Sequence, residues 1–298
     1  MDTDRLTRFA RKSAAEKRAT IRFFARRALS RLPYAPIHTW LTLATGEPLR
    51  FWWSYIPMAD HVDRTLLEYW GDDVGDLRFL CRFLRPRDVF VDVGAYHGIF
   101  SLVAAQKIGS EGRIIAFEPS ERERRRFDLH MRWNGVRGVV LEPFAVSSGN
   151  EPLEFFTVAS GFTTMNSLKK PPIDHPVREI TVEAISLDEY FKKHDVTRLD
   201  VMKIDVEGGE IEAFRGAAHM LRSLRPLVIC EVLDWVARSW GHAARDVITF
   251  LQEFGYEWFD FRDDGTISRH QPLGEYPDAR NYLAVPREKL ALVERWLR

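Results

Sequence analysis

An acid and two glycines stand close together in the segment V-F-V-D-V-G-A-Y-H-G, residues 89–98. Gly94 and Gly98 allow the backbone to approach a ligand, and the helix expected after them offers free N–H groups at its start. A pyrophosphate site carries G-x-G-x-x-G, whereas this segment reads D-x-G-x-x-x-G. Asp92 would repel a phosphate but suits a ligand with an ammonium and a sulfonium. The segment therefore favours S-adenosylmethionine (AdoMet) as cofactor.

A second acid, Glu118, ends the apolar run R-I-I-A-F. It follows the glycine turn by about 20 residues, the distance at which an acid meets the ribose hydroxyls of a bound nucleotide. Residues 144–147 follow the next short strand, where adenine rests in sheets of this kind. Both features agree with a nucleoside ligand.

Two later strands also end in acids. Asp205 and Glu207 close the run D-V-M-K-I-D-V-E, and Glu231 closes P-L-V-I-C-E. The carboxyl ends of parallel strands lie beside the cofactor in open α/β sheets, so these acids could take the proton of a methyl acceptor. Strand alternation would point Asp205 and Glu207 to one side, with Lys203 one step deeper. We expect Asp205 and Glu207 to be catalytic and Lys203 to pair with an acid, since burying it alone is costly.

Three alternatives stay open for this chemistry. His97, inside the glycine turn, is a candidate base near the methyl group or simply a residue at the start of a helix. Glu207, followed by Gly208 and Gly209, could instead favour a helix N-terminus, as could Glu210. Asp205 and Glu231 would suit a magnesium ion that holds a hydroxyl acceptor, if the enzyme uses a metal, although two carboxylates alone are weak evidence for one.

The pattern of apolar runs predicts the elements that position these residues. Strands alternate with helices, which is typical of a doubly wound, mostly parallel α/β sheet. Segment 160–176 reads as a long loop and a candidate wall of the active site, because loops of that length are more often functional than idle. Capping boxes are expected at Ser120 and Ser186. Strands are predicted over 89–93, 113–118, 139–141, 151–158, 178–184, 200–207, 226–232, 256–261 and 282–285, and helices over 76–84, 99–108, 120–134, 186–194, 210–224, 243–254 and from 287.

Charge is unevenly spread along the 298 residues, although the formal net charge is zero. Residues 1–31 carry ten basic and three acidic side chains, a net charge of +7, and the rest carries −7. We expect a helical arm over 3–31 that is packed or solvated, or that contacts an acidic surface, membrane or partner. The tryptophan-rich stretch over 40–70 is expected to pack on the main domain rather than to form a sugar-stacking platform. Nucleic acid is not an expected partner, because only the arm is basic.

Cys81 and Cys230 are the only cysteines, and they indicate neither a disulfide framework nor a zinc site. No apolar run reaches the roughly 18 residues of a membrane span, and the N-terminus lacks the apolar centre of a signal peptide. We expect a cytoplasmic protein without a transmembrane segment. The oligomeric state is left open by the sequence, and an oligomer is compatible with it.

Residues from about 88 to 256 resemble the FkbM family of AdoMet-dependent methyltransferases. The resemblance rests on V-D-V-G-A-Y-H-G (91–98), F-E-P (117–119), N-G (134–135), S-L-D (186–188), K-I-D-V-E-G-G-E (203–210) and R-P-L-V-I-C-E (225–231). It implies a Rossmann-like class I methyltransferase fold with a seven-stranded sheet whose last strand is antiparallel. It also implies that Asp92, Gly94 and Gly98 contact the methionine part and Glu118 the ribose. The candidate cofactor-binding residues are then Asp92, Gly94, Ala95, Tyr96, Gly98, Glu118, Pro119 and Ala145.

We therefore expect a helical, basic and aromatic-rich extension over 1–85 and a methyltransferase domain over 86–298. The favoured function is O-methylation of a hydroxyl on a sugar, glycoconjugate or small natural product. An NAD-linked oxidoreductase is the alternative enzyme, and Asp92 and the missing third glycine argue against it. A non-catalytic binding module on the same fold is the third hypothesis, which turnover would distinguish.

Overall fold

A computed structural model describes residues 37–44, 48–55, 75–159 and 163–298 of the chain. The predicted helix over 3–31 lies outside the described residues. Within them, no helix has the length and apolar character needed to cross a membrane.

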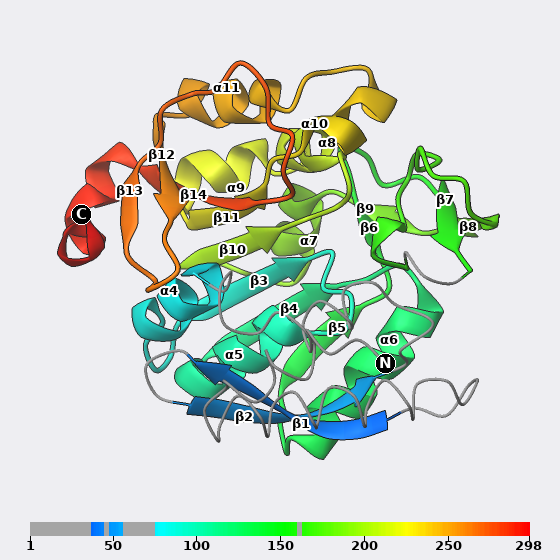
Figure 1. Ribbon diagram of the computed structural model, residues 1–298, viewed down its shortest axis with the longest axis horizontal. Coiled ribbons are helices and arrows are strands. Elements are labelled where there is room, and N and C mark those ends of the chain that lie inside the picture. The colour runs from blue at the N-terminus through cyan, green and yellow to red at the C-terminus, as the bar shows by residue number, and fades with distance from the viewer. Residues whose placement is uncertain (1–36, 45–47, 56–74, 160–162) are drawn as a thin grey trace, which may run out of the picture.

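An eight-stranded sheet forms the centre of the molecule, in the order β13-β12-β14-β11-β10-β3-β4-β5 (Figure 1). The five strands from β11 to β5 run parallel, whereas β14 is antiparallel to β11 and to β12. These seven strands confirm the predicted class I arrangement, and β13 adds a short eighth strand at the edge. The strands are β3 (Val89–Val93), β4 (Arg113–Phe117), β5 (Val139–Glu142), β10 (Val201–Ile204), β11 (Leu227–Glu231), β12 (Tyr256–Phe261), β13 (Ile267–Arg269) and β14 (Asn281–Pro286).

Helices cover both faces of the sheet, because its strands carry apolar side chains on each side. In β3, Val91 and Val93 belong to one buried core, and Phe90 between them belongs to the other. The first core packs under α7, α8, α9 and α11, and the second under α4, α5 and α6. The helices are α4 (Gly75–Phe83), α5 (Ile99–Ile108), α6 (Glu121–Trp133), α7 (Leu187–Lys193), α8 (Glu210–Arg215), α9 (Ala218–Ser223), α10 (Asp234–Ala237) and α11 (Arg245–Glu253), with 3-10 turns η1 (Thr163–Met165), η2 (Arg238–Trp240), η3 (Arg287–Leu292) and η4 (Glu294–Trp296).

The predicted helix over 210–224 is interrupted. Asp188, from another helix, accepts hydrogen bonds from the backbone N–H groups of His219 and Met220, so that a new helix begins there. The carbonyl of Gly216 accepts from the N–H of Asp188 instead of continuing α8. The helix predicted from 287 is also wrong in type, since η3 and η4 are 3-10 turns.

The two capping boxes differ. Ser186 accepts from the backbone N–H of Glu189 as predicted. Ser120 instead donates its hydroxyl to the Glu123 carboxylate, while its own N–H is donated to Glu118. Glu118, which follows β4, therefore accepts the hydrogen bond from the Ser120 N–H that a capping box would assign to Glu123.

Two short sheets lie beside the central one. Strands β7 (Leu153–Val158) and β8 (Val177–Val182) form an antiparallel pair, and β6 (Ala145–Val146) pairs in parallel with β9 (Ala184–Ile185). The strand predicted over 151–158 is thus confirmed, outside the main sheet.

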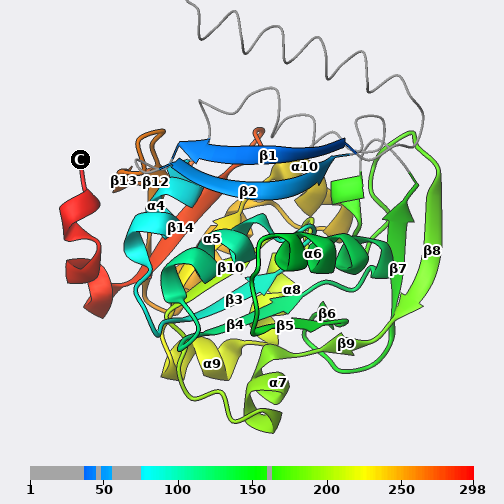
Figure 2. The ribbon, with the colours of Figure 1, turned by 90° about the horizontal axis from the view of Figure 1, so that it is seen from below.

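The described part of the N-terminal extension ahead of α4 is a β-hairpin, so the helical expectation is wrong there. Strands β1 (Ile37–Ala44) and β2 (Pro48–Tyr55) pair antiparallel and lie across α6 (Figure 2). Asn134 fixes the hairpin: its Oδ1 accepts from the N–H of Trp52 at 2.7 Å and its Nδ2 donates to the Trp52 carbonyl at 2.9 Å. Phe51 and Trp53 are buried, which confirms the expected core packing for these two residues.

Candidate active site

A cavity of about 600 Å³ opens at the carboxyl ends of β3, β4, β10 and β11. This edge is where doubly wound sheets bind ligands, and the volume falls within the roughly 300–1,000 Å³ typical of small-molecule sites. Its walls come from the glycine turn, the 117–119 and 144–146 segments, the loop over 163–168 and the residues after β10 and β11. Of the loop predicted over 160–176 as a wall, residues 163–166 and 168 line the cavity.

Gly94 and Gly98 both adopt positive φ, at +74° and +85°. A Cβ on Gly94 would lie 1.9 Å from the Asp205 carbonyl oxygen, and one on Gly98 would lie 2.6 Å from the Phe127 ring. The glycine turn is therefore required by the packing of β3 against the end of β10 and against α6, in addition to any ligand.

Asp92 and Lys203 are cross-strand neighbours beneath this turn. Asp92 is 2% exposed and accepts a hydrogen bond from the Ser101 hydroxyl at 2.6 Å. Burial raises the pKa of Asp92 to about 6. The Lys203 ammonium lies 3.0 Å from Asp205 and 5.1 Å from the centre of the Phe100 ring. The lysine is thus paired with an acid, as predicted.

Glu118 is buried at the end of β4 and is held by two backbone donors. Its Oε2 accepts from the N–H of Tyr96 at 3.0 Å, and its Oε1 accepts from the N–H of Ser120 at 2.8 Å. Burial, reinforced by the nearby Glu123 charge, raises the pKa of Glu118 to about 8. Each carboxylate oxygen keeps a further lone pair, which is what a pair of ribose hydroxyls would require.

Asp205, Glu207 and Glu231 gather as predicted, with their carboxylate oxygens within 4.8 Å of one another. The alternation argument is wrong, because β10 ends at Ile204 and Glu207 lies in a turn with φ +55°. The Glu207 carbonyl accepts from the Trp240 indole at 3.0 Å and from the Ser167 hydroxyl at 3.1 Å. These bonds fix the turn that brings the acids together.

The carboxyls of Glu207 and Glu231 have pKa values well above the usual range. Burial is the main cause, and the like charges of the neighbouring acids add to it. Glu210 accepts from the backbone N–H groups of Val206 and Gly208, so Glu210, rather than Glu207, serves the start of α8. Glu207 is left to face the cavity.

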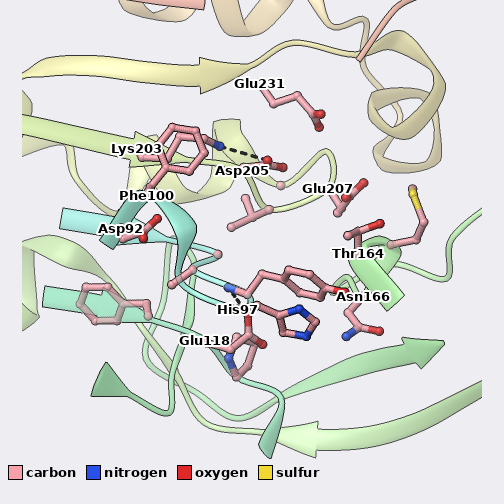
Figure 3. A pocket seen from close by; sticks show the side chains of 18 of the residues that line it. Asp92, His97, Phe100, Glu118, Thr164, Asn166, Lys203, Asp205, Glu207 and Glu231 are labelled. Atoms are coloured by element: carbon pink, nitrogen blue, oxygen red, sulfur yellow. Dashed lines mark hydrogen bonds and ion pairs between the residues drawn. The ribbon is translucent and has the colours of Figure 1, made fainter. Parts of the chain in front are cut away.

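His97 lies at the other end of the cavity from this group, beside Glu118 (Figure 3). His97 is 3% exposed, and its ring stacks on the Tyr96 ring with 3.6 Å between the ring centres. Its Nε2 lies 3.5 Å from Nη1 of Arg126, and its backbone carbonyl accepts from the His130 ring at 2.8 Å. The structure therefore does not bring His97 together with Asp205 and Glu207.

The remaining predicted cofactor residues, Ala95, Tyr96, Pro119 and Ala145, all line the cavity. Tyr96 also anchors the loop wall, since its hydroxyl lies 2.6 Å from that of Thr163.

Sequence reasoning missed Trp53, Asp76, Phe100 and Trp235 as cavity residues. Trp235 could have been found from its place four residues after Glu231, the acid that ends β11. Trp53 had no such local signal, because the hairpin that carries it is positioned by contacts with a distant segment.

Comparison with known proteins gives consistent matches. A family model described as "Methyltransferase FkbM domain" matches residues 92–258. The chain is similar to "Methyltransferase 1" of Beauveria bassiana, with 26% identity over 166 residues that cover 50% of this chain and 66% of the relative. It is also similar to "Hexuronic acid methyltransferase AglP" of Haloferax volcanii, with 27% identity over 157 residues that cover 51% of this chain and 59% of the relative.

Among solved structures, the methyltransferase FkbM from Methylobacillus flagellatus aligns with a TM-score of 0.42 and 14% identity, over 75% of this chain and 52% of that chain. For the two curated relatives named above, the chain spans less than two thirds of their length.

Proposed function

The chain belongs to the FkbM methyltransferase family, and from that premise we propose that it is an AdoMet-dependent O-methyltransferase acting on a hydroxyl of a sugar, glycoconjugate or small natural product. One observation carries the proposal: a single cavity joins a buried acid at the end of β4, held by two backbone donors, to a group of acids at the ends of β10 and β11. The first suits a ribose and the second a hydroxyl that must lose its proton.

The residues present fit AdoMet. Asp92, Gly94 and Gly98 would hold its methionine part and Glu118 its ribose, while Pro119 and Ala145 would flank its adenine beside the aromatic rings of Phe144 and Phe155 that also line the cavity. Bound AdoMet supplies an electrophilic methyl group on a sulfonium. The neighbouring carboxylates favour that positive charge, because opposite charges attract most strongly where water is excluded.

Asp205 and Glu207 would prepare the acceptor. The Lys203 ammonium, 3.0 Å from Asp205, holds that carboxylate in place, so that Asp205 can accept a hydrogen bond from the acceptor hydroxyl and orient it. Glu207, whose pKa is raised by burial, would take the hydroxyl proton as the new O–C bond forms and the C–S bond breaks. Holding the three reacting atoms in line supplies much of the rate enhancement.

The sugar class of acceptor is supported by the name of the Haloferax relative, although each match covers only part of the relative's length.

The three acids at the ends of β10 and β11 could also be considered as ligands of a magnesium ion. Asp205, Glu207 and Glu231 offer the oxygen donors that Mg²⁺ prefers, but Lys203 already neutralises Asp205. The methyltransferase therefore needs no metal in this proposal.

We further propose that residues 86–298 form the methyltransferase domain and that 1–85 extend it. The extension adds Trp53, Asp76 and Leu77 to the cavity, which makes it a part of the site.

Calorimetry with AdoMet and with its demethylated product, S-adenosylhomocysteine (AdoHcy), tests the proposal. Saturable binding of both is expected, and binding of neither would overturn it. Titration with NAD(H) is the matched test of the oxidoreductase alternative, for which no saturation is expected.

A further inference from the structure

The tryptophan that the hairpin adds to the cavity wall also packs against two buried histidines. The Trp53 ring stacks on the His130 ring, with 3.9 Å between the ring centres and 22° between the ring planes. It also meets the His97 ring edge-on, with 6.4 Å between the centres. His130 belongs to α6 and His97 to the glycine turn. Strand β2 therefore contacts the turn that lines the cofactor end of the cavity.

Hydrogen bonds join the same three segments. Nδ1 of His130 lies 2.8 Å from the His97 carbonyl oxygen, and it carries the hydrogen because a carbonyl only accepts. Nδ2 of Asn134 donates to the His130 carbonyl at 2.7 Å and to the Trp52 carbonyl at 2.9 Å. The stacked Trp53 ring holds the plane of the His130 ring and, with it, the direction of the N–H that reaches the turn.

The glycine turn has a conformation that needs support from outside. Tyr96 has a φ of +49°, which is costly for a residue other than glycine. Its ring stacks on the His97 ring, with 3.6 Å between the centres. Its N–H is one of the two backbone donors that hold Glu118, at 3.0 Å. The His97 ring, packed between Tyr96 and Trp53, therefore helps to keep this N–H on Glu118.

We propose that Trp53 is a positioning residue of the cofactor site, which acts through His97 and Tyr96 on the orientation of Glu118. This inference rests on the proposed function, in which Glu118 holds the ribose. The family model begins at residue 92, so Trp53 lies outside the residues that it matches. The N-terminal extension thus completes the cofactor site of the methyltransferase domain.

The expected effect on affinity follows from the balance at Tyr96. The contribution of two ring contacts is comparable with the cost of a left-handed backbone conformation, so removing the indole lets the turn relax. Apparent affinity falls with the fraction of the protein that keeps the binding conformation. Trp53→Leu should therefore bind AdoHcy about tenfold more weakly, which corresponds to about 1.4 kcal/mol. Trp53→Phe retains a ring and should retain most of the affinity.

A second buried tryptophan provides the matched control. Trp296 is 6% exposed, contacts the Phe79 and Phe83 rings at 5.5 and 5.6 Å between centres, and does not line the cavity. Trp296→Leu should lower the melting temperature without changing AdoHcy affinity. Calorimetry measures the affinity, at a temperature where urea titration shows that each variant is folded. Trp53→Leu that binds AdoHcy as tightly as Trp296→Leu does overturns the proposal.

A double-mutant cycle tests the route through His97. His97→Leu should also weaken AdoHcy binding, and adding Trp53→Leu to it should have little further effect, because both changes release the same Tyr96 ring. Effects that multiply, to a loss on the order of 100-fold, would show that Trp53 acts independently of His97 and would overturn the proposed route.

The wild-type protein gives a test that depends on no variant. Coupling is reciprocal, so AdoHcy should slow amide hydrogen exchange over 51–55 in β2, measured by mass spectrometry. Exchange in α11, on the other face of the sheet, should not change. Unchanged exchange in β2, or equal slowing in α11, would overturn the coupling. Wild-type protein that binds no AdoHcy would instead refute the proposed function itself.

Discussion

Replacing Glu118 by Gln should selectively damage cofactor binding. Two backbone N–H groups, from Tyr96 and Ser120, converge on the two carboxylate oxygens. A glutamine offers only one acceptor oxygen, so one of these donors, together with one ribose hydroxyl, loses its partner. The lost hydrogen bond to a charged group is worth about 1.5–3 kcal/mol, which corresponds to roughly 10- to 100-fold weaker AdoHcy binding.

The pH dependence of binding gives the same prediction a second readout. With a pKa of about 8, Glu118 holds a proton in the free protein near neutrality, and the ribose hydroxyls require the ionised form. Cofactor affinity should therefore rise with pH toward 8, by at most about tenfold per pH unit, and level off above the pKa. Glu118→Gln should remove this slope.

Isothermal calorimetry in buffers of different ionisation enthalpy measures both affinity and proton release. Glu142→Gln is the matched control, because Glu142 ends the adjacent strand β5 and accepts from the Tyr190 hydroxyl without lining the cavity. Two results would refute the assignment of Glu118 to the ribose. One is a Glu118→Gln variant that binds AdoHcy as tightly as the wild-type protein, and the other is a wild-type protein whose affinity for AdoHcy does not change with pH.

Asp205→Asn should abolish methyl transfer while AdoHcy binding, followed by calorimetry, stays within a few-fold of wild type; turnover at the wild-type rate would remove Asp205 from the mechanism. Asn134→Ala breaks both bonds to Trp52 and should lower the free energy of unfolding by about 1–3 kcal/mol in urea titrations, which an unchanged midpoint would contradict. Gly94→Ala should prevent cofactor binding or folding, since its Cβ would meet a backbone oxygen at 1.9 Å; a folded variant that binds AdoHcy normally would show that the turn can yield. The raised pKa of Glu118 means that the folded state holds a proton that the unfolded state has lost, so without cofactor the melting temperature should fall as pH rises from about 5 to 8, and a rise would contradict this burial.

The sequence was sufficient for the features that depend on local pattern. Apolar runs defined the seven core strands. Glu118 and Asp205 directly follow β4 and β10, and Glu231 ends β11, so these acids lie at one edge because parallel strands share their carboxyl ends. The detailed argument for Glu207 was wrong, yet the turn after β10 still delivers it to the cavity.

Features set by contacts between distant segments could not be predicted. The hairpin that carries Trp53 is fixed by a bond between Trp52 and Asn134, which are 82 residues apart. The break before α9 depends on Asp188, about 30 residues earlier in the chain. His97 lines the cavity with the other residues of the glycine turn, but its contacts with Tyr96 and His130 hold it at the end away from Asp205 and Glu207.

The central claim is transfer of a methyl group from AdoMet to a hydroxyl. Its most direct test is incubation with AdoMet labelled in the methyl group and a panel of neutral sugars, nucleotide sugars and polyketide or lipid alcohols, with and without Mg²⁺, followed by mass spectrometry. We predict one AdoHcy formed for each label incorporated, the label in an alkali-stable methyl ether, and the same rate in the presence of a chelator. Label found on nitrogen or carbon, or AdoMet left unconsumed with every acceptor, would contradict the account.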